Sequence, residues 1–224
     1  MLTARDLRLV FGQTVALANV SVTVSPGEVI SLTGPSGSGK SSLLYCLSGI
    51  VAPTQGTVSF DGTDITRASQ AELSRLRRER FGFVFQFAEL VPELTLRENV
   101  ALPLELLRTP RRERLGRVEA LLERLGILAQ ADRRPAQVSG GQAQRAAVAR
   151  ALVHRPAVVF ADEPTGSLDS LAGQIVLQAL LELADESDSA VIFATHDASV
   201  AASATRRVVL QDGLVVDRTA MVAS

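Results

Sequence analysis

The chain has 224 residues, 46% of them hydrophobic, a formal net charge of -1 and one cysteine. This length suits one domain with a large core, and one cysteine excludes an internal disulfide framework. The near-neutral charge argues against a nucleic-acid-coating protein, and no stretch approaches the roughly 20 apolar residues that cross a membrane.

The first part of the chain predicts strands around a glycine-rich loop. Alternating or apolar runs are typical of strands, and they occur at Leu7–Phe11, Ala18–Val24, Val29–Thr33 and Gly56–Phe60. Val20, Val22 and Val24 share one face of their strand. Asp61 and Gly62 predict a hairpin turn, and Lys40–Ile50 predicts a helix after the loop.

The middle of the chain has the apolar spacing of helices, and strands return towards the end. The predicted helices are Ser69–Arg80, Arg111–Leu125, Gly141–His154 and Ser170–Asp185, with loops at Gly82–Glu93 and Ala129–Val138. Later strands are predicted at Ala157–Ala161, Ala190–Thr195, Val208–Leu210 and Leu214–Val216. The layout predicts an α/β core with an antiparallel β edge and a helical insert.

The glycine-rich loop fits the pattern G-x-x-x-x-G-K-[ST] between a strand and a helix, as a phosphate-binding loop requires. Its residues are Gly34, Pro35, Ser36, Gly37, Ser38, Gly39, Lys40, Ser41 and Ser42. Such glycines let backbone N–H groups face phosphate oxygens, and the helix adds its positive end. Lys40 can reach the β- and γ-phosphates, and the Ser41 hydroxyl suits Mg²⁺. The alternative is a loop that only caps a helix.

Two carboxylates end the predicted strand at Ala157–Ala161. Asp162 and Glu163 would lie at the sheet edge where ligands meet parallel strands. Asp162 would support Mg²⁺, and Glu163 would polarise the attacking water in phosphoryl transfer. Alone, the pair also fits a strand followed by an acidic turn.

A second glycine motif opens the helix predicted at Gly141–His154. It reads Val138, Ser139, Gly140, Gly141 and Gln142. Ser139 suits a helix N-cap, but a serine and two glycines at a helix start also suit an anion. A second such motif beside one nucleotide loop indicates that two copies complete each other's sites.

With this motif the chain resembles the ATPases of ABC transporters over essentially its full length. Val138–Gln142 is similar to the family signature LSGGQ, with Val138 in place of leucine. Phe11 resembles the aromatic residue that stacks on adenine, and Gln86 the glutamine that senses Mg²⁺ and links to the membrane partner. Ser167, Leu168 and Asp169 resemble the loop that crosses the dimer interface, and His196 the residue that contacts the γ-phosphate.

The resemblance implies a P-loop NTPase fold, with a RecA-like core in one domain of residues 1–224 and a helical subdomain at about 87–155. It implies an ATP-hydrolysing enzyme in which Lys40, Gln86, Glu163 and His196 act in catalysis. Ser41, Gln86 and Asp162 would serve the metal, and Asp169 the nucleotide. Two copies, expected to be identical, would hold ATP between Gly34–Ser42 of one and Ser139–Gln142 of the other. A membrane-spanning permease would hold them at the cytoplasmic face of the membrane, without nucleic acid.

A narrower resemblance is to ATPases of lipoprotein release, macrolide export and cell division. It rests on Glu89–Thr95, Glu98–Leu104 and Ala161–Asp169. A solute-importer ATPase and a non-transport ATPase of the same superfamily are the alternatives.

Two surface features allow more than one interpretation. The basic runs are a solvated helix face or attract anionic lipid headgroups; they comprise Arg75, Arg77, Arg78, Arg80, Arg108, Arg111, Arg112 and Arg114. The apolar stretch Phe87–Leu94 belongs to the core or receives a helix of the membrane subunit. Cys46 lies on the helix predicted after the glycine-rich loop, and we expect its thiol to be buried and inert.

Overall fold

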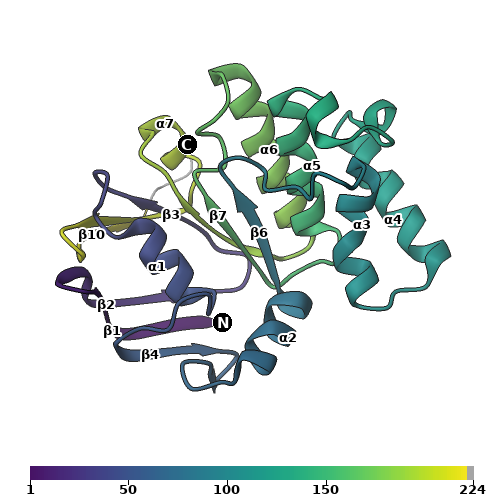
Figure 1. The fold of residues 1–224 in the computed structure, drawn as a ribbon. Coiled ribbons are helices and arrows are strands. Elements are labelled where there is room, and N and C mark those ends of the chain that lie inside the picture. The colour runs from purple at the N-terminus through teal and green to yellow at the C-terminus, as the bar shows by residue number, and fades with distance from the viewer. Residues whose placement is uncertain (221–224) are drawn as a thin grey trace. The chain divides into compact units, whose positions relative to one another are not determined.

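The computed structural model describes residues 1–220, which form two compact units (Figure 1). The first unit joins Met1–Arg77 to the chain from Ala190 onward, and the second is Arg78–Ser189. Strands and helices alternate in both units, as predicted for the α/β class. Within residues 1–220, no helix combines the length and apolar character that a bilayer crossing demands.

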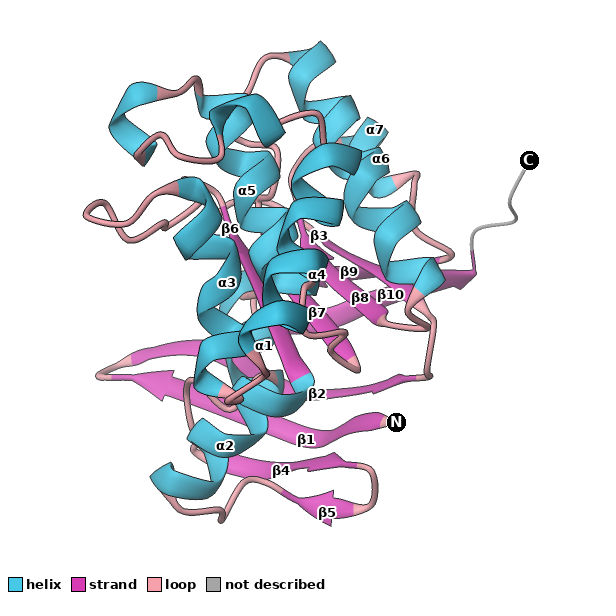
Figure 2. Cartoon of the chain, turned by 90° about the vertical axis from the view of Figure 1, so that its right-hand side faces the viewer, coloured by secondary structure: helices cyan, strands magenta, loops and turns pink. Residues whose placement is uncertain are grey.

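The first unit contains an antiparallel sheet in the order β2-β1-β4-β5, whose strands lie side by side in Figure 2. The strands are β1 (Leu2–Phe11), β2 (Thr14–Val24), β4 (Gln55–Phe60) and β5 (Thr63–Asp64). The expected face of Val20, Val22 and Val24 is buried. The predicted hairpin at Asp61 and Gly62 joins β4 to β5. Both predictions are confirmed.

Parallel strands of the same unit flank the glycine-rich loop. β3 (Val29–Thr33) pairs in parallel with β8 (Ala190–Ala194) and with β9 (Arg206–Gln211), which forms a hairpin with β10 (Leu214–Ala220). The helices are α1 (Lys40–Leu47), α7 (Ala198–Ala201) and α2 (Gln70–Arg80), whose last turn passes into the second unit. Helix α1 ends at Leu47 instead of Ile50, because Gly49 has a φ of 65°.

The second unit is built on the parallel pair β6 (Phe81–Phe85) and β7 (Val158–Asp162). The predicted loop at Gly82–Glu93 is therefore wrong in its first part. The alternating rings of Phe81, Phe83 and Phe85 have the period of a strand, and Phe81 packs edge-on to Phe160 at 5.1 Å. Gly82 allows the backbone of Ala151 to approach, since a Cβ there would lie 2.3 Å from its carbonyl oxygen.

Helix α5 (Gly140–Leu152) contacts β6, α3, α4 and α6 within this unit, and Figure 1 shows it between α6 and α3. The other helices are α3 (Leu96–Leu106), α4 (Arg111–Arg124) and α6 (Ser170–Glu186), with short 3₁₀ turns at Leu128–Gln130 and Pro135–Gln137. Helix α3 was not predicted. It contains Pro103, which breaks the helical pattern, but a reciprocal cap between Thr95 and Glu98 begins it.

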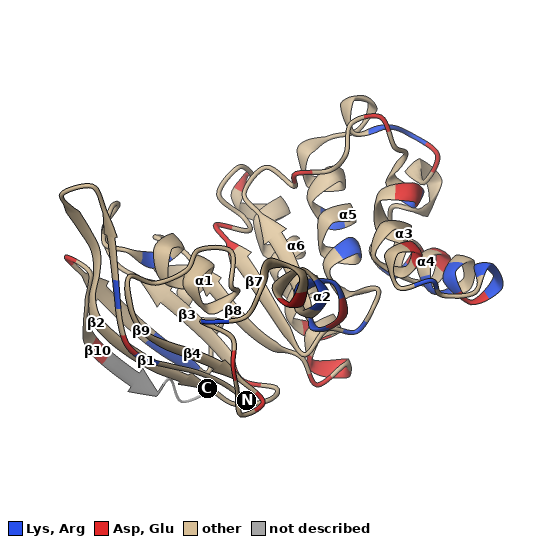
Figure 3. Ribbon diagram, turned by 60° about the horizontal axis from the view of Figure 1, so that its bottom comes forward, with Lys and Arg blue, Asp and Glu red and all other residues tan. Residues whose placement is uncertain are grey.

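The basic runs are exposed or partly exposed and lie among acidic residues. Figure 3 shows both charges along α4. Arg114 pairs with Glu105 at 3.3 Å, and Arg117 with Glu113 on the next turn. Exposure fits both a solvated helix face and attraction to anionic lipid headgroups, so both interpretations stay predictions.

Candidate functional site

The loop Gly34–Ser42 follows β3 and turns directly into α1. Gly34, Gly37 and Gly39 all have positive φ, at 140°, 79° and 102°. Lys40 is 8% exposed, and its ammonium donates to the carbonyl oxygens of Gly34 and Pro35 at 2.9 Å each. The loop thus wraps around a single buried positive charge.

This loop has the properties of an anion cradle. Helix α1 begins at Lys40, and its N-cap Gly39 makes no side-chain cap hydrogen bond, so the positive end of the helix faces the loop. The hydroxyl of Ser38 is buried and makes no hydrogen bond within the described residues. A Cβ on Gly34 would fill the space beside Ser38, 2.8 Å from its Oγ. Phosphate oxygens fit this set of donors.

His196 and Phe11 belong to the same unit as the loop. The N–H of Thr195 donates to the carbonyl of Leu32 at 3.0 Å, so exposed His196 follows β8 at the edge where β3 ends. Asp197 caps α7 by accepting from Ser199, whose hydrogen bonds lower the pKa of that carboxyl. Phe11 ends β1 with its side chain 54% exposed, as a stacking surface requires.

Gln86, Asp162 and Glu163 come together in the second unit. Phe85 lies opposite Asp162 in the parallel ladder, so Gln86 and Glu163 leave the same edge of the strand pair. A Cβ on Gly166 would lie 3.0 Å from Nε2 of Gln86 and 3.4 Å from Cβ of Glu163. Glu163 has a φ of 47°, a conformation that non-glycine residues adopt rarely and often at functional positions.

Ser139 is the N-cap of α5. Its hydroxyl accepts from the N–H of Gln142 at 3.3 Å, and the Gln142 side chain accepts from the N–H of Ser139 at 3.0 Å. Leu168 lies beside Gly140, since its Cδ2 would be 3.6 Å from a Cβ there, an ordinary contact. Asp169 caps α6 by accepting from Ala172 at 2.9 Å. The helix-cap alternative for Ser139 is therefore realised, while its nucleotide role and that of Asp169 stay predictions.

The predicted site residues thus form two sets, one in each unit. Gln144 was not singled out from the sequence, although it is buried and bonded to the backbone beside two of these residues. The available signal was a second glutamine in α5, two residues after Gln142 and next to a run of small apolar residues. Asn99, fully buried in α3, was missed as well.

Side-chain oxygens that suit Mg²⁺ are present among the predicted site residues. Across residues 1–220, no group of three or more His, Cys, Asp or Glu side chains is arranged to hold a metal. Mg²⁺ in nucleotide sites is held by one or two protein oxygens and the phosphates. Ser41 and Asp162 supply hard oxygens of the right kind.

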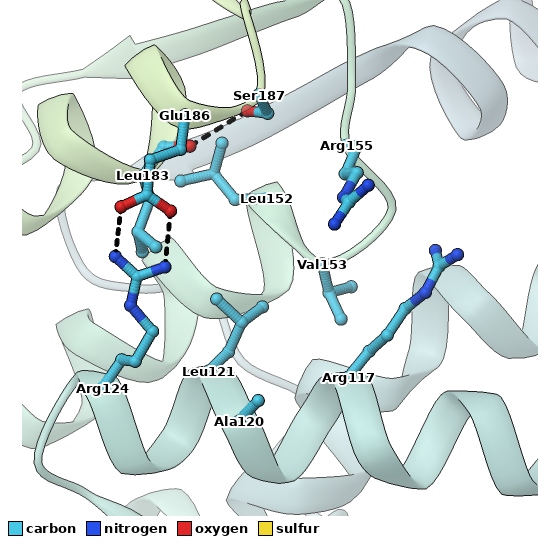
Figure 4. A pocket seen from close by; sticks show the side chains of 10 residues that line it. All are labelled: Arg117, Ala120, Leu121, Arg124, Leu152, Val153, Arg155, Leu183, Glu186 and Ser187. Carbon is cyan, nitrogen blue, oxygen red and sulfur yellow. Dashed lines mark hydrogen bonds and ion pairs between the residues drawn. The ribbon is translucent and has the colours of Figure 1, made fainter.

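A pocket between α4, the end of α5 and the end of α6 contains none of the predicted site residues (Figure 4). Leu121, Leu152 and Val153 are among the residues that line it. On one side Arg124 makes two hydrogen bonds to Glu186, at 2.6 and 2.5 Å, which tie α4 to α6.

Comparison with known proteins gives consistent matches. The profile of the family described as ABC transporter matches residues 17–166. The lipoprotein-releasing system ATP-binding protein LolD 2 of Caulobacter vibrioides is 43% identical, with 95% of each chain covered. The same system's LolD of Aquifex aeolicus is 41% identical, with 96% of each chain covered. The macrolide export ATP-binding/permease protein MacB of Rhodospirillum rubrum is 46% identical over 90% of this chain and 31% of that protein.

Solved structures agree with these matches over the whole chain. The ATP-binding cassette MJ0796, as a dimer in a post-hydrolysis state bound to ADP and Pi, has a TM-score of 0.91 and 36% identity. A second dimeric structure of MJ0796, described as a bacterial ABC transporter cassette, has a TM-score of 0.92 and 37% identity. Both cover 100% of each chain, which confirms the predicted fold.

Proposed function

Since this chain belongs to the ABC transporter family, we propose that it works as an Mg²⁺-dependent ATPase subunit that drives a membrane-spanning permease. ATP binding and hydrolysis are what this family does, and this chain is an ATPase of it. The observation that carries the proposal is the buried ammonium of Lys40 inside an uncapped, glycine-rich helix start.

The phosphates of ATP would bind to the loop Gly34–Ser42. Backbone N–H groups at the start of α1 and the positive end of that helix attract the phosphate oxygens. Lys40 would exchange its contacts with the carbonyls of Gly34 and Pro35 for contacts with the β- and γ-phosphates. The exposed ring of Phe11 supports its role as the surface on which the adenine stacks.

Hydrolysis would use Glu163 to orient and polarise the attacking water. Gln86 leaves the same strand edge and would help to position this water. His196 would donate to the γ-phosphate as charge develops on it. When bound, Mg²⁺ neutralises charge on the phosphate oxygens, and Ser41 and Asp162 are the residues that would hold it, with Gln86 nearby.

A second copy of the chain would complete each site. Ser139, Gly140, Gly141 and Gln142 would contact the nucleotide held by the partner's loop, and Asp169 would lie at the interface. The dimeric form of MJ0796 bound to ADP and Pi supports this arrangement. The coupled work would be release or export at the cytoplasmic face of a membrane, in line with the names of the LolD and MacB relatives.

The decisive experiment compares two single variants with the unaltered chain. Lys40→Ala should abolish tight ATP binding, because it removes the charge that meets the phosphates. Glu163→Gln should keep ATP affinity but lose roughly 10²–10⁴-fold in turnover, the usual contribution of a general base, and accumulate as a dimer. Unchanged ATP affinity in the first variant, or turnover near that of the unaltered chain in the second, would contradict the proposal.

Amine labelling offers an independent check, because Lys40 is the one lysine of the sequence. An acylating reagent can modify only Lys40 and the amino terminus. Mg-ATP should slow acylation of Lys40 and leave that of the Met1 amine unchanged, since the latter pairs with Asp61 away from the loop. Equal protection of both amines would argue against binding at the loop.

The shared site and the membrane partner need separate tests. Ser139→Arg in one copy of a mixed dimer should disable one of two sites. Hydrolysis that does not depend on protein concentration would exclude a shared site. Co-purification from membranes, followed by mass spectrometry, would identify the permease and distinguish an export or release system from an importer or a non-transport ATPase.

A further inference from the structure

Gln144 is a buried polar side chain in the middle of α5. It is 1% exposed, and its amide Nε2 donates to the carbonyl oxygen of Phe85 and to that of Pro164, both at 2.8 Å. An amide nitrogen carries two hydrogens, so both donors of Gln144 are used. The two acceptors lie in different segments of the chain, which this one nitrogen joins.

The two acceptors are the immediate neighbours of the proposed catalytic residues. Phe85 precedes Gln86, and Pro164 follows Glu163. The parallel ladder between β6 and β7 ends at the pair of Phe85 and Asp162. Strand pairing therefore does not hold Gln86 or Glu163, which follow this pair. Gln144 joins Phe85, at the end of the ladder, to Pro164, beyond the end of β7 and directly after Glu163 with its left-handed conformation.

The same helix carries the second glycine motif at its start. Ser139 caps α5, and Gly140 lies one turn before Gln144 on the same face. Farther along, the half-buried Arg150 donates to the carbonyls of Glu89 and Ala88 at 2.7 and 2.8 Å. Helix α5 therefore holds the backbone on both sides of Gln86 and beside Glu163.

We propose that Gln144 is a positioning residue that fixes Gln86 relative to Glu163 and ties both to α5. The inference rests on the proposed function, because it assigns Gln144 a role through those two residues. Because Gln144 is 1% exposed, it would act through these residues and not by contact with the nucleotide. A shift of α5 would move the carbonyls of Phe85 and Pro164 together. Contact of a second copy with Ser139 would therefore change the positions of Gln86 and Glu163.

The test uses Gln144→Met, which keeps the length of the side chain and removes both donors. Gln178→Met is the matched control, because Gln178 makes one exposed hydrogen bond to Glu182 on α6. Rates are divided by the number of ATP-binding sites found by titration, so that unfolded protein does not count. We expect kcat to fall at least tenfold in Gln144→Met, with KM and ATP affinity within twofold and the control unchanged.

Gln144→Glu is a second variant, which keeps the shape of the side chain and replaces the amide NH2 by an oxygen. It should show the same loss in kcat, because an ionised carboxylate cannot donate to the two carbonyls. A rate within twofold of the unaltered chain in either variant overturns the proposal. A parallel loss of kcat and ATP affinity also overturns it, because that pattern marks a general structural role.

A double variant separates this inference from the function beneath it. If Gln144 acts through Glu163, adding Gln144→Met to Glu163→Gln should change the residual rate less than twofold. A full multiplicative loss would refute the positioning role. Turnover near that of the unaltered chain in Glu163→Gln alone would instead refute the assignment of Glu163, whatever Gln144 does.

Discussion

Gly34 and Gly37 both have positive φ, but alanine at the two positions should have different effects. At Gly34 a Cβ would lie 2.0 Å from the carbonyl oxygen of Leu210 in β9, a backbone atom that cannot rotate away. At Gly37 no atom lies within 4 Å of such a Cβ. Gly37→Ala therefore changes backbone strain alone, whereas Gly34→Ala adds a collision.

The magnitudes follow from these two terms. Alanine in a left-handed conformation destabilises the folded chain by about 1–2 kcal/mol. About 0.4–1 kcal/mol of this is offset, because alanine lowers the conformational entropy of the unfolded chain. We therefore expect Gly37→Ala to lower the free energy of unfolding by about 1 kcal/mol. Overpacking adds about 1–3 kcal/mol, so Gly34→Ala should lower the free energy of unfolding by about 2–4 kcal/mol.

Urea unfolding without nucleotide measures this difference. With a slope of about 3 kcal/mol per molar urea, the midpoint should fall by about 1 M for Gly34→Ala and by about 0.3 M for Gly37→Ala. Equal midpoints for the two variants would refute the argument, because the contact with Leu210 would then impose no constraint on the loop.

Three further predictions concern polar side chains that are buried or partly buried. Asn99→Ala should lower the free energy of unfolding by about 1–3 kcal/mol in urea titrations, since the N–H of Val91 loses its acceptor while the Val91 carbonyl keeps the N–H of Leu94. Burial lowers the pKa of His154 despite its contact with the Phe81 carbonyl, so the unfolded chain binds more protons. Stability should therefore fall as pH drops below about 6.5, and His154→Gln should show a smaller fall. Burial raises the pKa of Cys46 to about 12; a disulfide reagent at pH 8 should label it in urea only, and rapid labelling of the folded chain would contradict its burial.

The glycine-rich loop was predictable because its information is local. Gly34, Lys40 and their neighbours stand in a fixed spacing between an apolar strand and a helix, and the structure has that order. The burial of Cys46 and of the valine face of β2 also followed from short-range patterns. In each case the deciding residues lie within a few positions of one another.

The features that were missed depend on contacts between distant segments. Gly82 indicated a loop, but it allows α5 to pack closely on β6. Helix α3 was missed because Pro103 interrupts its helical pattern, although the spacing of Thr95 and Glu98 fits a helix cap. Gln144 contacts Phe85 and Pro164, which lie 59 and 20 positions away in the sequence. No local spacing in the sequence predicts these contacts.

The two helix starts at the glycine motifs differ in what an incoming phosphate would find. At α1 the N-cap is Gly39, which makes no side-chain cap hydrogen bond, whereas at α5 the hydroxyl of Ser139 already accepts from Gln142. Displacing such a cap costs about 1 kcal/mol, or about fivefold in affinity. Within the proposed dimer this imposes an order of assembly. ATP would load on the open helix start first, and the self-capped helix of the second copy would engage only a nucleotide already held in place.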